Sequence, residues 1–288
     1  MRVLLDASDL IDLVEHERPH AADLVVTTFR EQSWRFVFSN TNVSEFASAI
    51  HRTADRLKIR ALLLKLEELP HIVIRDAFVE SLELVEAFVA FRRNTEPDPA
   101  SVFGDRWDEV MVPVGRPKQT EKVVNLHIHD IVFRLARDGV FDWSNFSQST
   151  VDAILEDRES RKTSKVTDFD RFWRTLAARM RVFALGPTQD EERRRLAKWL
   201  ASNPRRCPGT WFAYRVREEL VSNKGDIPKI GDLADLNHMC CVPYVDAATF
   251  DRRMLGYART AAAKIKKSQG VDYTQRLKAN LGDILAGA

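Results

Sequence analysis

Two acidic segments near the start of the chain constrain its fold more than any other feature. Residues 3–5 form an apolar run that leads directly into Asp6. Residues 34–38 form a second apolar run, and the helix predicted after it carries Glu45. Short apolar runs that stop at a polar junction are typical of buried strands followed by helices. Both acids are therefore expected just after a strand.

Two further acidic segments follow near residue 240, after a long stretch of different character. A glycine precedes a predicted helix over 232–241, and an apolar run over 243–248 predicts another strand. The acids of these segments are Asp232, Asp235, Asp246 and Asp251. The chain thus places acids at four strand-and-helix junctions.

The four junctions together predict one shared site. In parallel α/β sheets, ligands bind beyond the carboxyl ends of the strands, so acids placed there meet at one edge. Carboxylate oxygens are the ligands that Mg²⁺ and Mn²⁺ prefer, and a cluster without a counter-ion would repel itself. The expected metal ligands are Asp6, Glu45, Asp235, Asp246 and Asp251, and Asp232 is an alternative or additional catalytic acid.

Each acid also has a local structural explanation. Asp6, Asp232 and Asp251 could cap helices. Glu45 lies three residues after Asn42, which is the spacing of a capping box. Asp246 interrupts an apolar strand and could pair with an arginine. The shared metal site is favoured because all of these acids lie on the side of a sheet where sites form.

Three other residues are expected to support these acids. Ser8 follows Asp6 by two positions and could orient its carboxylate. Thr249 could hold the geometry at the end of its strand. His238 lies one turn after Asp235 and could donate a hydrogen bond to a carboxylate.

The same residues resemble the PIN-domain nucleases. That family has an aspartate closing its first strand with a Ser or Thr two positions later, as in Asp6 and Ser8, and a glutamate in the helix after its second strand, as in Glu45. It has an aspartate opening a later helix, which Asp232 or Asp235 matches, and a final Thr-x-Asp segment, which residues 249–251 match. The segment Gly-Asp-x-x-Asp-x-x-His followed by Pro-Tyr-Val-Asp resembles larger bacterial PIN-like proteins. The resemblance covers roughly residues 1–52 and 225–265.

The resemblance implies a function and a set of partners. PIN nucleases use Mg²⁺ or Mn²⁺ to hydrolyse phosphodiester bonds, leaving a 5′-phosphate and a 3′-hydroxyl. Most cut RNA, and many are toxins, so RNA is favoured over DNA and an antitoxin or defence-system partner is expected. Two alternatives remain: a PIN-like RNA-binding or assembly subunit that has lost catalysis, and a metal-dependent DNA nuclease.

The organisation predicted from the sequence is an α/β core interrupted by a helical insertion. Residues 1–52 and 225–288 are expected to form a PIN-like parallel sheet flanked by helices, and residues 53–224 a mainly helical insertion packed on it. Residues 71–75 have strand character, and the Pro- and Gly-rich residues 94–118 predict an irregular loop. Further helices are expected over 54–69, 76–93, 120–138, 148–160, 166–182, 188–202, 208–223, 251–268 and 274–285.

Composition limits the setting in which the chain works. Its 288 residues, with 44% apolar and 30% charged content, suit a soluble protein, and the net charge of +2 excludes no partner. Three cysteines, two of them adjacent, indicate neither a disulfide framework nor a zinc site. No apolar run approaches a membrane span, and an acid at position 6 excludes a signal peptide. A cytoplasmic location without membrane contact is therefore expected.

Local basic density suggests where nucleic acid binds. Basic residues neutralise phosphates, and aromatic faces stack on unpaired bases. Aromatic residues are interleaved with basic ones between positions 193 and 217. A solvated helix face over core aromatics is the alternative for any one of these residues. The predicted contacts are Arg193, Arg194, Arg195, Lys198, Arg205, Arg206, Lys264 and Lys267.

Overall fold

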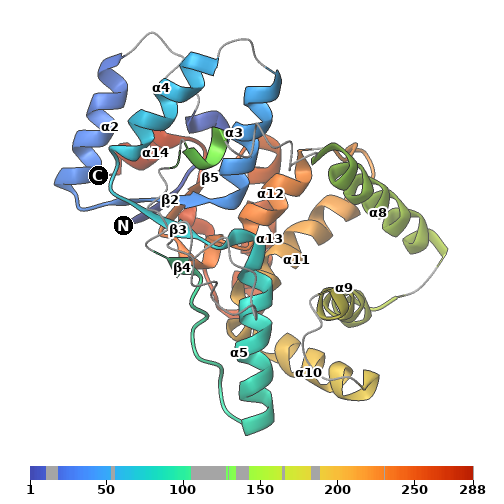
Figure 1. Ribbon diagram of the computed structural model, residues 1–288. Helices are drawn as coiled ribbons and strands as arrows, with labels where there is room; N and C mark the ends of the chain where they lie inside the picture. The colour runs from blue at the N-terminus through green and yellow to red at the C-terminus, as the bar shows by residue number, and fades with distance from the viewer. Residues whose placement is uncertain are drawn as a thin grey trace.

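In the computed structural model, the strands of the described residues form one six-stranded sheet in the order β4-β3-β2-β1-β5-β6 (Figure 1). All neighbours are parallel except β3 and β4. The structure describes residues 1–10, 19–52, 56–104, 128, 130–133, 143–163, 166–182, 189–229 and 231–287. The strands are β1 (Arg2–Leu4), β2 (Arg35–Ser39), β3 (His71–Ile74), β4 (Phe103–Gly104), β5 (Ala247–Thr249) and β6 (Leu277–Lys278).

Alternating side chains divide the core into two layers, one on each face of the sheet. Val3 and Leu5 are buried in one cluster, whereas Leu4 between them is buried in the other. This alternation follows from the two-residue repeat of a strand. The first layer contains α2 (Pro19–Glu31), α3 (Asn40–Arg52), α4 (Arg56–Glu67) and α14 (Leu281–Leu285).

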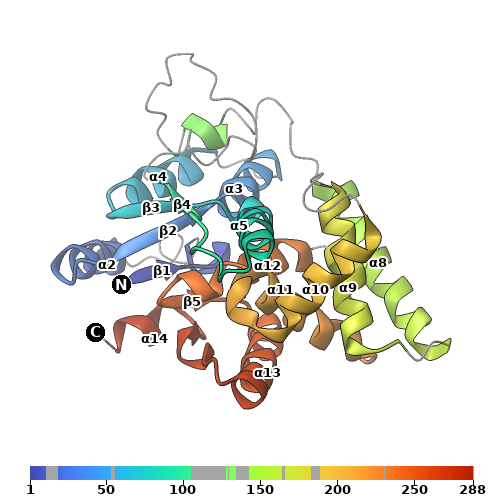
Figure 2. The ribbon, with the colours of Figure 1, turned by 90° about the horizontal axis from the view of Figure 1, so that it is seen from below.

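The second layer is larger and comes mostly from the middle of the chain. It packs helices on the Leu4 side of the sheet and extends away from it as a stack of helices (Figures 1 and 2). Its helices are α5 (Val79–Arg93), α8 (Trp143–Thr163), α9 (Asp168–Val182), α10 (Asp190–Ser202), α11 (Pro208–Ser222), α12 (Asp232–Met239) and α13 (Arg252–Gln269). Four 3₁₀ turns connect elements, at Asp76–Phe78 (η1), Pro204–Arg206 (η2), Val242–Tyr244 (η3) and Thr274–Arg276 (η4).

Helix α11 begins on a fully buried carboxylate. Glu83 accepts hydrogen bonds from the backbone N–H groups of Gly209 and Thr210, at 2.6 and 2.8 Å, and from the Thr210 hydroxyl at 2.6 Å. The Tyr244 hydroxyl donates a further bond to it. Burial raises the pKa of Glu83, and these hydrogen bonds oppose that rise. An acceptor at a helix N-terminus satisfies N–H groups that the helix itself leaves unpaired.

The sheet does not stop at the predicted core. β3 lies between β2 and β4, although residues 71–74 and 103–104 belong to the range predicted as an insertion. The boundary at residue 53 is therefore wrong for the sheet. Residues 94–102 have no regular structure, as predicted for this loop, and residues 105–118 lie outside the described residues. The predicted helix over 120–138 also lies mostly outside them, with residues 130–133 helical.

The C-terminal segment differs from its prediction. Residues 274–285 were expected to form one helix, but they form the turn η4, the edge strand β6 and the short helix α14. Part of the predicted strand over 243–248 is the turn η3, and β5 begins only at Ala247. The fold is nevertheless α/β, with a mostly parallel sheet flanked by helices. None of the described helices is long and apolar enough to cross a membrane.

Candidate functional site

The carboxyl ends of β1, β2, β3 and β5 meet at one edge of the sheet. The backbone N–H of Asp6, after β1, donates to the Thr249 hydroxyl at the end of β5, at 2.9 Å. The Asn42 carboxamide, at the start of α3, donates to the Leu5 carbonyl at 3.2 Å. These bonds tie three strand ends together and fix where the acids that follow them lie.

Asp6 is oriented by its neighbours in the predicted manner. The Ser8 hydroxyl donates to Asp6 Oδ2 at 2.5 Å, and the Ser8 backbone N–H lies 3.4 Å from the same oxygen. Thr249, which is fully buried, holds the Asp6 backbone. Ser8 and Thr249 therefore lie where they can position this carboxylate.

Glu45 points into the same region from the second turn of α3. Burial raises its pKa well above the usual value, and the negative charges of Asp6, Asp235 and Asp76 raise it further. Its Oε2 is buried and has no hydrogen-bond partner among the described residues. A buried carboxylate oxygen without a partner is costly, and a cation or a proton would remove that cost.

The capping-box explanation for Glu45 does not fit the structure, because α3 begins at Asn40 rather than Asn42. Asp76 occupies the helix start: its carboxylate accepts from the N–H groups of Asn40 and Thr41, at 2.8 and 2.9 Å, and from the Thr41 hydroxyl. The Asn42 side chain instead accepts from the Ser39 backbone N–H and hydroxyl. Glu45 thus has no part in capping its own helix.

Asp235 lies on α12, close enough to Asp6 for the two charges to interact. Burial raises its pKa to about 8, and the charges of Asp6, Asp251 and Asp232 act in the same direction against the opposing charge of Arg253. Between the two aspartates that the resemblance allowed, Asp232 is the one with its own counter-ion. It pairs with Arg253 and accepts from the Lys229 N–H at 2.9 Å. Asp235 is the one that joins the cluster.

Asp251 combines a structural role with a place beside the cluster. Its Oδ1 accepts from the Met254 N–H at 2.6 Å, which caps α13. Its charge also raises the pKa of Asp235. Capping and closeness to the cluster are therefore compatible at this residue.

Asp76 was not predicted as a site residue. It lies just after β3, it is buried, and its charge raises the pKa of Glu45. Its signal in the sequence is the same as that of Asp6, an apolar run ending near an aspartate, but the run lay inside the predicted insertion. Asp76 fixes the start of α3 and so helps to place Glu45.

His238 is buried behind the carboxylates. Burial lowers its pKa, while the charges of Asp76 and Asp6 oppose that fall. Its Nε2 lies 2.7 Å from the Ser39 hydroxyl, which also contacts Asn42. The predicted hydrogen bond to a carboxylate is absent from the described contacts, and His238 instead joins the Ser39 and Asn42 hydroxyl–amide network.

Asp246 does not join the cluster, which corrects its prediction as a metal ligand. It precedes β5, at the opposite end of that strand from Thr249. Its carboxylate accepts from the Arg2 backbone N–H at 2.7 Å, and its own N–H donates to the Arg2 carbonyl at 2.9 Å. This end of the sheet is opposite the edge where the acids meet. The exposed Asp246 therefore joins the amino-terminal ends of β1 and β5 and does not contact the cluster.

The predicted nucleic-acid contacts lie apart from the carboxylates. Helix α10 lies at the end of the molecule away from α3 and α12 (Figure 1). Four of the predicted contacts are already paired: on α10, Arg193 with Asp190 and Arg194 with Asp170; in η2, Arg206 with Glu96; and on α13, Lys264 with Glu219. The remaining four, Arg195, Lys198, Arg205 and Lys267, are exposed. A single continuous basic surface running to the site is not formed by these residues.

The clustered carboxylates are of the type that binds cations, but their side chains are not arranged to coordinate one. In the part of the chain that the structure describes, no group of three or more His, Cys, Asp or Glu side chains could hold a metal ion as it stands. Asp6, Glu45, Asp235 and Asp251 nevertheless act on one another electrostatically. The unpartnered oxygen of Glu45 and the raised pKa values fit a site whose side chains rotate inward around a cation.

A scan of protein-family models and searches of curated proteins and of solved structures gave no match to this chain.

Proposed function

We propose that this chain is a divalent-metal-dependent endonuclease, with RNA as the favoured substrate. The observation that carries the proposal is the set of carboxylates at the carboxyl edge of the sheet, where burial, and then the charges of neighbouring acids, raise the pKa values of Glu45 and Asp235. Such an arrangement is unfavourable for stability alone, and a divalent cation makes it favourable. The preference for RNA comes from the resemblance to PIN-domain nucleases.

Four acids would hold the ion or ions: Asp6, Glu45, Asp235 and Asp251. A bound Mg²⁺ or Mn²⁺ supplies an activated water and neutralises charge on the phosphate under in-line attack. The rest of the chain positions these ligands. Ser8 and Thr249 orient Asp6. Asp76 fixes the start of the helix that carries Glu45.

Arg253 has a separate role in this proposal. It bridges Asp232 and Asp226, with the Asp226 contact at 2.8 Å. Because Asp232 is neutralised in this way, its charge competes less for the cation. Arg253 also anchors the first turn of α13 directly after Asp251, which keeps that ligand beside α12.

A cleavage assay with a matched pair of variants tests the proposal. Asp235→Asn removes a charge from the cluster, whereas Asp246→Asn makes the same chemical change at the other end of the sheet. We expect the wild type to cleave mixed-sequence RNA when MnCl₂ is added, and Asp235→Asn to lose roughly 100-fold or more of that rate. Asp246→Asn should keep it. Parallel reactions on single-stranded DNA separate the DNA-nuclease alternative.

If the wild type shows no Mn²⁺-dependent cleavage of either nucleic acid, and Mn²⁺ leaves its melting temperature unchanged at millimolar concentration, the nuclease proposal is wrong. Metal binding to the folded state must raise that temperature by mass action. A non-catalytic RNA-binding or assembly module then takes its place.

A further inference from the structure

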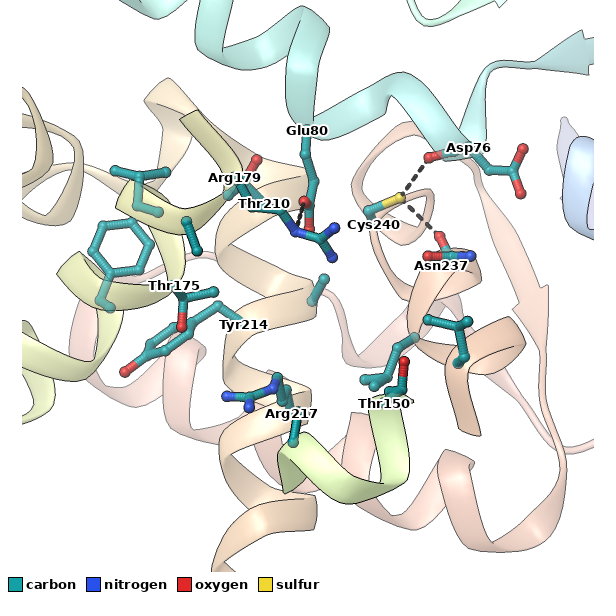
Figure 3. Close-up of a pocket in the computed structure, with 17 residues that line it drawn as sticks. Asp76, Glu80, Thr150, Thr175, Arg179, Thr210, Tyr214, Arg217, Asn237 and Cys240 are labelled. Atoms are coloured by element: carbon teal, nitrogen blue, oxygen red, sulfur yellow. Dashed lines mark hydrogen bonds and ion pairs between the residues drawn. The ribbon is translucent and has the colours of Figure 1, made fainter. Parts of the chain in front are cut away.

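A cavity of about 420 Å³ lies beside α12 (Figure 3). Residues of α5, α8, α9, α11 and α12 form its walls. This volume is in the range of small-molecule binding sites.

The cavity persists because its walls are tied to one another. Arg179 on α9 pairs with Glu80 on α5 at 2.9 Å, and Arg217 on α11 pairs with Asp157 on α8 at 3.0 Å. The buried Arg158 also fixes α8 on the end of α11, since its guanidinium donates to the Leu220 and Val221 carbonyls, at 2.7 and 3.2 Å. These contacts therefore fix the positions of the walls relative to one another.

The lining combines apolar surface with two guanidinium groups. Leu236, Ala153 and Ala178 supply apolar wall, and Glu80, which pairs with Arg179, also lines the cavity. Arg179 and Arg217 lie on the upper and lower sides of the cavity in Figure 3. Each pairs through one N–H group in the contacts above, and a guanidinium has five such donors. Those remaining suit a phosphate, which arginine binds with charge-assisted hydrogen bonds.

Asn237 adds a carboxamide that can form hydrogen bonds with the edge of a heterocyclic ligand. Its side chain lines the cavity and makes no hydrogen bond with the described residues. A carboxamide offers both a donor and an acceptor. An apolar slot with one carboxamide and two arginines thus matches a flat heterocycle that carries an anionic group.

The cavity lies on the opposite side of α12 from Asp235. Successive residues of a helix are turned by about 100°. Leu233 and Asn237 each lie two positions from Asp235, so they face away from it across α12. Helix α12 therefore lies between the cavity and Asp235, although Asp76 and Glu80 also line the cavity.

We propose that this cavity binds a small organic anion with a flat apolar body, of the class of nucleoside monophosphates. The base lies against Leu236 and the neighbouring alanines, Asn237 contacts its edge, and the phosphate lies between Arg179 and Arg217. The proposal concerns a site distinct from the one assigned to cleavage, and it stands whether or not the chain is a nuclease.

Calorimetric titration of the full chain tests this with adenosine 5′-monophosphate as the first probe and the other three ribonucleoside monophosphates beside it. We expect saturable binding of at least one of the four, with its uncharged nucleoside about tenfold weaker because the charge-assisted bonds are lost. Arg217→Met should weaken the monophosphate about tenfold and leave the nucleoside unchanged. Arg174→Met, an equal charge change on the exposed side of α9, should change neither.

A second variant and two further titrations complete the test. Ala213→Leu fills the cavity from α11 and should remove binding of both ligands while the protein remains folded by circular dichroism. Asp235→Asn should retain the binding even if it loses cleavage, which separates this proposal from the nuclease proposal. A 5′-phosphorylated tetranucleotide that competes equally well identifies the ligand as a strand end, and one that does not identifies it as the free nucleotide.

The proposal is overturned if none of the four monophosphates shows saturable binding at several millimolar. It is also overturned if Arg174→Met weakens binding as much as Arg217→Met. That outcome would mean that the protein attracts anions through its general charge.

Discussion

Burial and neighbouring negative charge act together on Asp235, and both favour its protonated form. Its folded pKa of about 8 lies above the value of about 3.9 expected in the unfolded chain. The folded state therefore holds a proton that the unfolded state has already released over this range. Stability that this group contributes is complete below about pH 4 and is lost as the pH rises toward 8.

We expect Asp235→Asn to flatten this pH dependence. In EDTA, the wild-type melting temperature should fall between pH 5 and pH 8 more steeply than that of the variant, which should gain about 1–2 kcal/mol at pH 8. Added Mn²⁺ should raise the wild-type value most at the higher pH, where the carboxylates are charged. Thermal unfolding across that range, followed by circular dichroism, measures this.

Asp246→Asn is the control, since that carboxylate lies far from other acids of the cluster and accepts only at the sheet terminus. A wild-type melting temperature that rises steadily from pH 5 to pH 8 in EDTA would contradict the prediction. So would an Asp246→Asn curve that matches Asp235→Asn.

Residue patterns predicted some members of the cluster and missed others for a physical reason. Asp6 and Glu45 follow strands whose apolar runs are clear, so their position at the edge of the sheet could be predicted. Asp246 and Asp251 flank the same short strand, and only the observed register shows which end each occupies. Asp76 follows an equally clear run, but its strand pairs with β2 through contacts that no local pattern specifies.

At the level of elements, α11 connects the sheet layer to the outer helices, and its first turn allows no side chain at Gly209. A methyl group there would overlap the Cys240 carbonyl oxygen and lie 2.8 Å from Val79 Cγ1. Gly209 also donates its N–H to Glu83. The helix can approach α5 and α12 this closely only because the position has no Cβ.

Gly209→Ala should therefore destabilise the protein by about 1–3 kcal/mol, because backbone and side chain would both have to move. Gly256→Ala is the matched control. Gly256 lies on the exposed face of α13, and an added Cβ would have no atom within 4 Å. Alanine there should therefore stabilise the protein by about 0.5–1 kcal/mol. Urea unfolding of both variants checks the opposite signs, and equal effects would show that the close approach at Gly209 relaxes at little cost.

Long periodic elements could be predicted within a few residues, and short ones could not. The helices observed at Asp168–Val182, Asp190–Ser202 and Pro208–Ser222 match their predicted ranges closely. The prediction of a single helix over 274–285 was wrong because the two-residue strand β6 forms only by pairing with β5. Tertiary pairing decides such short segments, whereas periodicity decides long ones.

At the scale of the whole molecule, one apolar cluster runs from the sheet to the outermost helices. Leu4 and Val37 of the central strands belong to the same cluster as Phe172 on α9 and Leu196 on α10. Residues 53–224 thus share their core with the rest of the chain. If this range were separated from the rest of the chain, β3 would lose its pairing with β2.

Residues 53–224 expressed alone should therefore fail to fold, while the full chain should unfold cooperatively. Near-ultraviolet circular dichroism of the fragment should show no fixed tertiary signal. Limited proteolysis of the intact protein should likewise release no stable piece of this range. A fragment that gives a dispersed spectrum and a sharp thermal transition would contradict the continuous core.

The central position of β1 has a consequence for the order in which the protein can be completed. β1 lies between β2 and β5, and more than two hundred residues separate β1 from β5 in the chain. During synthesis, the β1 edge of the nascent sheet therefore stays open while those residues are added, and an open edge invites wrong pairing. Asp235 and Asp251 arrive together with β5. The carboxylate cluster can therefore be assembled only after α12, β5 and the start of α13 have been made.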